Sequence, residues 1–127
     1  MADNTREYLR NAEGILLDLK KELESYKKHI NTKQLDSVLF EINKLLDLLE
    51  QKRIKNPNAY LLTIRDAMKR TKKIRQDVLA GLVEILEKTT PPKNIKELKN
   101  RWIELTQLAQ KELALAFNEY KHLIEVS

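Results

Sequence analysis

The sequence predicts an all-α protein, an antiparallel up-down-up-down four-helix bundle with short loops. Apolar residues recur every three or four positions along nearly the whole chain, which is the period of an α-helix. The 127 residues include only two glycines and three prolines, whereas a β-sandwich or barrel needs turn residues about every 8–12 positions. We therefore expect a single domain spanning residues 1–127, with helices at about 5–30, 33–54, 57–88 and 94–125.

The first two helices are predicted from their apolar stripes. The first follows Asn4, whose side chain we expect to cap the helix with Glu7 as its return partner. The second begins after the interruption at Asn31 and Thr32, and its stripe is wide enough for the interior of a bundle. The stripe residues are Leu9, Ala12, Leu16, Leu19, Leu23, Tyr26 and Ile30 in the first helix and Leu35, Val38, Leu39, Ile42, Leu45, Leu46 and Leu49 in the second.

The last two helices are predicted from the breaks that bound them. Pro57 is tolerated in the first turn of a helix, and Pro91-Pro92 ends the third helix. Gly81 lies near the inward face and indicates close approach of a neighbouring helix. Connections this short favour antiparallel neighbours, although a dimer of two long hairpins would use the same pattern. The core residues expected for the whole chain are Leu16, Leu19, Leu23, Leu39, Ile42, Leu46, Ile64, Met68, Val78, Leu82, Leu98, Trp102, Leu105 and Ala109.

Positive charge is concentrated in one segment of the chain. Residues 51–76 hold nine basic residues and one acidic residue, whereas residues 1–50 and 77–127 each hold a small excess of acidic residues. A helical wheel places several of the basic residues on one stripe opposite the apolar face, and this stripe is termed the basic ridge. The ridge consists of Arg65, Lys69, Lys72 and Lys73, with Arg70 at its flank. Arg75 falls toward the apolar side, where we expect it to extend to the surface or to pair with a carboxylate.

Several interpretations of the ridge are open. It concentrates positive potential, which attracts phosphate, an acidic protein or an anionic lipid surface, but it also fits the solvated face of a Lys- and Glu-rich protein. Aromatic residues are not interleaved with the basic ones, which disfavours stacking on single-stranded bases. There is also no helix-turn-helix pattern. If nucleic acid binds, we expect a duplex held through its phosphates with little sequence preference.

Residues that carry catalysis or bind cofactors are sparse. The chain has no cysteine, and therefore no thiolate metal site and no cysteine nucleophile. It also has no glycine-rich phosphate loop and no recognisable Ser-His-Asp arrangement. Glu119 and His122 have the spacing that di-iron bundles use, but the second such pair is missing. We therefore expect no enzyme, no metal, no cofactor and no small-molecule substrate.

Four large apolar residues fall outside the inward stripes, namely Leu17, Phe40, Leu62 and Ile103. They indicate either a second interface, as in an oligomer, or lateral packing at the edges of broad stripes. The first residues show no signal-peptide pattern, and no apolar stretch approaches the roughly 18–20 residues of a membrane span. We expect an intracellular or virion location.

The composition resembles that of small all-helical structural proteins of hyperthermophilic archaeal viruses. The features that carry this resemblance are 17 lysines, Ile- and Leu-rich stripes and short loops braced by proline. Nine asparagines and five glutamines depart from it, and no site residue is transferred. The resemblance implies a non-enzymatic, self-associating structural protein of a virion, with itself or another structural protein as partner. The alternative is a small nucleic-acid-associated protein that contacts duplex phosphates through the basic ridge.

Overall fold

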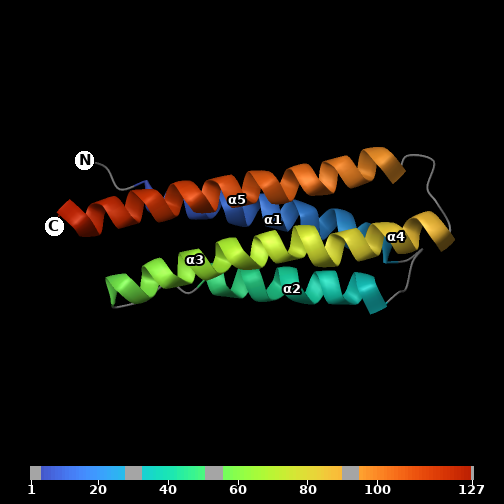
Figure 1. Cartoon of the computed structure of the whole chain (residues 1–127), viewed down its shortest axis with the longest axis horizontal. Coiled ribbons are helices and arrows are strands. Elements are labelled where there is room, and N and C mark those ends of the chain that lie inside the picture. The colour runs from blue at the N-terminus through green and yellow to red at the C-terminus, as the bar shows by residue number, and fades with distance from the viewer. Residues whose placement is uncertain (1–3, 28–32, 51–55, 90–94, 127) are drawn as a thin grey trace.

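The chain is all-α throughout the part that the structure describes. The computed structural model describes residues 4–27, 33–50, 56–89 and 95–126, and every element in these ranges is helical. The elements are α1 (Thr5–Tyr26), α2 (Lys33–Leu49), α3 (Pro57–Lys73), the π-helical η1 (Ile74–Val78), α4 (Leu79–Thr89) and α5 (Ile95–Val126). Because α3, η1 and α4 continue one another, these ranges form four helical rods that lie side by side (Figure 1).

The predicted helix ends are less accurate than the predicted helix starts. α1 ends at Tyr26 and is followed by a turn at Lys27, and α2 ends at Leu49 with a turn at Glu50. The predicted ends at about residues 30 and 54 are therefore too late. Residues 28–30 and 51–54, which are predicted to continue the first two helices, lie outside the described residues. The same holds for the predicted start of the last helix at residue 94.

The starts of α1 and α3 differ in their capping. Before α3, the side chain of Asn56 accepts a hydrogen bond from the backbone N–H of Asn58 at 3.0 Å, which satisfies one of the N–H groups left without a helical partner. Asn4 precedes α1, but among the described residues its side chain makes no capping hydrogen bond. The predicted side-chain cap is therefore wrong. The backbone carbonyl of Asn4 accepts from the N–H of Tyr8 at 3.1 Å instead.

A π-helical turn shifts the inward face of the third rod. In η1, the N–H of Leu79 bonds the carbonyl of Ile74, five residues earlier rather than four. This wider turn accommodates an extra residue, so that Ile74, Leu79 and Leu82 are buried. The core position predicted at Val78 assumed an unbroken α-helix, and the Val78 side chain lies outside the described residues.

The four rods contact one another in a ring. α1 packs most extensively on α5, α5 also packs on the α3–α4 rod, and α2 contacts both α1 and the α3–α4 rod. Ala12 on α1 and Ala109 and Ala116 on α5 are fully buried, and such small side chains allow close approach of the two helices. Among the described residues no contact links α1 with α3 or α2 with α5, so each rod has two neighbours.

Most of the predicted core is buried between these rods. Trp102, at 1 % exposure, is the largest fully buried side chain that the structure describes. Three predicted core residues are half-buried instead of buried, and they pack against the core from its edge. They are Met68, Leu98 and Leu105. The predicted core residues that are buried are Leu16, Leu19, Leu23, Leu39, Ile42, Leu46, Ile64, Leu82, Trp102 and Ala109.

Packing explains neither glycine of the chain. A Cβ added to Gly81 would have Gln34 Oε1 as its nearest described neighbour at 3.9 Å, which is ordinary van der Waals contact. The close helix approach predicted there is therefore wrong. A Cβ on Gly14 of α1 would meet no described atom within 4 Å.

Gly14→Ala is expected to stabilise the protein by about 0.5–1 kcal/mol. A glycine in a helix interior costs about this much relative to alanine because it loses more backbone entropy on folding, and the added methyl group has open space. Chemical denaturation should give a higher midpoint with an unchanged m-value. Destabilisation would contradict the open environment of Gly14.

Candidate functional site

The basic ridge lies on an exposed side of α3. The apolar side of this helix is buried through Ile64, Ala67 and Thr71, so the opposite side faces solvent. Four ridge side chains are exposed and make no ion pair with any described residue. They are Arg65, Lys69, Lys72 and Lys73.

Arg70 differs from the other ridge residues. It is half-buried, and its Nε donates a hydrogen bond to Asp66 Oδ2 at 3.0 Å, an ion pair with i,i+4 spacing. Asp66 is the one acidic residue among residues 51–76. The Asp66 carboxylate therefore pairs with Arg70 and not with the exposed cations of the ridge.

Two side-chain contacts hold the ridge segment of the third rod against α5. Toward the start of α3, the rings of Tyr60 and Tyr120 meet edge to face with centroids 4.7 Å apart, an arrangement that aromatic pairs favour. Beyond the end of α3, in η1, Arg75 Nη1 donates to Gln110 Oε1 at 2.7 Å. The partner of Arg75 is thus a neutral amide and not the carboxylate that was one of its two predicted outcomes, so this bond does not neutralise its charge.

The apolar residues predicted outside the stripes stand on different helices. Leu17 on α1, Phe40 on α2 and Leu62 on α3 are exposed by 38, 57 and 61 %, whereas Ile103 on α5 is half-buried. The ring of Phe40 has Lys44 Nζ 4.6 Å from its centroid, a cation–π contact. The side packing of broad stripes therefore accounts for Ile103 but not for the other three.

Two exposed leucines on α5 are not predicted from the apolar stripes. Leu108 and Leu115 are 42 and 37 % exposed and stand seven residues apart, so they share one side of the helix. That spacing, displaced from the core stripe through Ala109 and Leu113, is the sequence signal that could have identified them.

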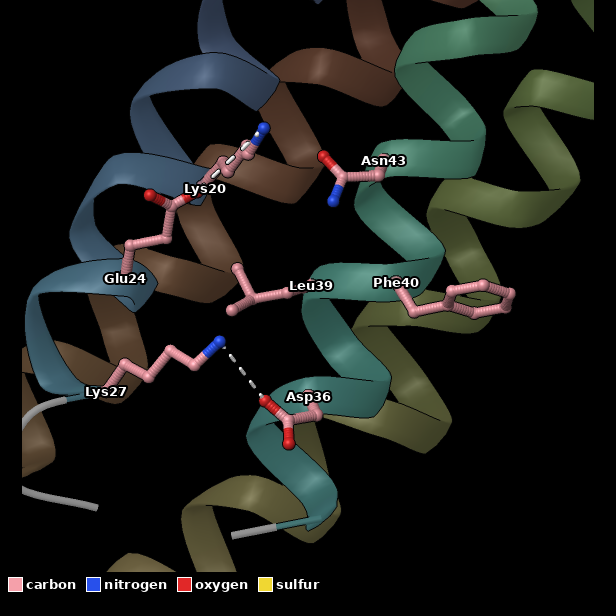
Figure 2. Close-up of a pocket in the computed structure, with 7 residues that line it drawn as sticks. All are labelled: Lys20, Glu24, Lys27, Asp36, Leu39, Phe40 and Asn43. Atoms are coloured by element: carbon pink, nitrogen blue, oxygen red, sulfur yellow. Dashed lines mark ion pairs between the residues drawn. The ribbon is translucent and has the colours of Figure 1, made fainter. Parts of the chain in front are cut away.

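A shallow groove runs between α1 and α2, and its charges balance one another. Lys20 Nζ lies 3.8 Å from Glu24 Oε1 within α1, and Lys27 Nζ lies 3.7 Å from Asp36 Oδ1 across the groove. Leu39 projects from α2 toward α1 between these pairs (Figure 2). The groove is lined by Lys20, Glu24, Lys27, Asp36, Leu39, Phe40 and Asn43. It offers no net charge to select a ligand, in contrast to the ridge.

A metal site and a membrane span find no support among the described residues. The described residues include no group of three or more His, Cys, Asp or Glu side chains that could hold a metal ion. Glu119 is half-buried and His122 is exposed near the end of α5. Within the described ranges, no helix has both the length and the apolar character that crossing a membrane requires.

Comparison of the chain with protein-family models, with curated proteins and with solved structures found no match. The basic ridge is the candidate site because four positive charges lie within about 12 Å of helix length, at about 1.5 Å per residue.

Proposed function

We propose that the four rods form an antiparallel up-down-up-down bundle with short loops. Asn11 Nδ2 donates to Glu112 Oε2 at 3.4 Å, and Arg101 Nε donates to Glu22 Oε1. From Asn11 to Glu22 the chain advances along α1, while the partner on α5 moves back from Glu112 to Arg101, as in an antiparallel pair. The ring of contacts within one chain favours this bundle over a dimer of two hairpins.

We propose that the protein is a non-enzymatic binding module whose basic ridge binds duplex nucleic acid through phosphate groups. The observation that carries this proposal is the group of four exposed cations on α3 that make no ion pair with a described residue. A duplex carries one negative charge per about 1.7 Å of its axis, so about 12 Å of ridge faces roughly seven phosphate charges. Lysine and arginine contacts to phosphate position a protein without reading bases, which fits binding with little sequence preference.

A ridge variant tests this proposal. The combined change Lys69→Gln, Lys72→Gln and Lys73→Gln removes three phosphate contacts and is expected to weaken duplex binding at least about 100-fold at 0.1 M salt. Fluorescence anisotropy with a labelled duplex measures this loss. The matched control is Lys21→Gln, Lys33→Gln and Lys44→Gln, which removes the same charge from exposed positions of α1 and α2 and should retain more of the affinity. A ridge variant that binds like the wild type would contradict the proposal.

Self-association, as in a structural protein of a particle, is the second candidate function. The exposed side chains of Phe40, Leu62, Leu108 and Leu115 favour it, because a monomer gains nothing from exposing them. Light scattering on a sizing column should then give a molar mass above the 15.0 kDa of the monomer that persists at high salt, since burial of apolar surface is not weakened by salt. A monomer at every protein concentration would contradict this candidate.

A further inference from the structure

The two sides of α5 carry different chemical groups. On the side toward α1, Glu112 accepts from Asn11 at 3.4 Å, and Glu119 follows seven residues later and so shares that side. On the side toward the third rod, Gln110 accepts from Arg75 of η1 at 2.7 Å. Glu112 and Glu119 therefore lie toward α1, away from the basic ridge.

Between Glu104 and Glu125, the outer edge of α5 next to α3 carries a row of residues without a carboxylate. These residues follow one another at intervals of four and three, which keeps them on one side of the helix. Lys111 and Lys121 are exposed and make no ion pair with a described residue. Gln107 and Asn118 are exposed amides whose N–H groups can donate to phosphate. This set, termed the α5 row, is Gln107, Lys111, Ala114, Asn118 and Lys121.

The contacts between the third rod and α5 place the α5 row beside the ridge. The Tyr60–Tyr120 contact lies at one end of the shared segment, and the Arg75–Gln110 hydrogen bond lies at the other. The ridge occupies the third rod between these contacts, and the α5 row follows the matching stretch of α5. Packed helices lie about 8–10 Å apart, so two rows of donors without an intervening carboxylate run side by side.

We propose that the ridge and the α5 row form one duplex-binding face, in which Lys111 and Lys121 contact a second row of phosphates. This inference rests on the proposed function of the ridge. A duplex presents phosphates on both sides of a groove that is about 6 Å wide for the minor and about 12 Å wide for the major groove. A single strand presents one row of phosphates, so the face prefers a duplex.

A double variant on α5 tests the second row. Lys111→Gln with Lys121→Gln removes two phosphate contacts, so the slope of log affinity against log salt should become shallower by about 2. At 0.1 M salt the affinity should fall roughly 50-fold. The matched control, Lys21→Gln with Lys44→Gln, changes the net charge equally on α1 and α2 and should keep the wild-type slope.

The failure of this inference is distinct from the failure of the proposed function. A wild-type protein that does not bind a duplex overturns the function of the ridge, and binding only to vesicles of anionic lipid has the same consequence. If the wild type binds and the ridge variant does not, the α5 variant decides the question. Wild-type affinity and slope in that variant would overturn the two-row face, as would equal binding of a single strand of the same length.

Discussion

Trp102→Ala is expected to destabilise the protein by about 3–5 kcal/mol, the range for removing a large aromatic side chain from a core. Trp102 is 1 % exposed and belongs to α5, the helix that packs on α1, α3 and α4. Its removal leaves a cavity that the surrounding rods can close only in part, because packed interiors do not rearrange freely. Domains of this kind have a total stability of about 5–15 kcal/mol, so the variant loses a large share of it.

Thermal unfolding followed by circular dichroism measures this effect, and the Tm should fall by roughly 10–20 °C. Leu62→Ala is the control, because Leu62 is 61 % exposed and its truncation should change the stability by no more than about 0.5 kcal/mol. If Trp102→Ala unfolded at the wild-type temperature, Trp102 could not lie within the core that joins α5 to the other rods.

The helices and most of the core could be predicted because one physical signal determines both. Residues spaced by three and four face the same way on a helix, so burial of Leu16, Ile42 and Ala109 follows from the pattern. The π-helical turn could not be predicted in this way. It brings Leu79 into the buried series, a position that the unbroken α-helical period does not predict.

The errors at single residues have a common cause. Asn4 and Gly81 were interpreted from their residue type, since asparagine commonly caps helices and glycine commonly permits close approach. Whether a cap forms or a neighbour lies close depends on the position of other atoms. The structure places no described atom closer than 3.9 Å to a Cβ at Gly81, and residue type carries no information about that distance.

The ridge could be predicted and the α5 row could not. Arg65, Lys69 and Lys72 lie on one helix, so their shared side follows from their spacing alone. Whether Lys111 lies beside the ridge depends on which side of α5 faces the third rod. Only contacts between helices, such as that of Arg75 with Gln110, show this side. The ion pair of Arg70 with Asp66 could be predicted only in part. Its i,i+4 spacing is visible in the sequence, but the sequence does not show whether the pair forms.

Duplex binding is expected to weaken steeply with salt, by an amount that reports how many cations take part. Each phosphate neutralised contributes about −0.9 to the slope of log affinity against log salt. The four exposed cations of the ridge alone predict a slope of about −3.6, and the affinity then falls roughly 100-fold between 50 and 200 mM salt. With Lys111 and Lys121 added, the slope is about −5.4 and the loss is roughly 2000-fold.

Anisotropy titrations of the wild-type protein at several salt concentrations distinguish these two slopes. The molar mass should be measured in the same buffers, because self-association through apolar side chains is not weakened by salt and would leave a constant oligomer while binding is lost. A slope near −5.4 supports contact with both helices, and a slope near −3.6 restricts contact to α3. A slope shallower than about −2 would contradict phosphate binding by the ridge, because fewer than about three contacts would then remain.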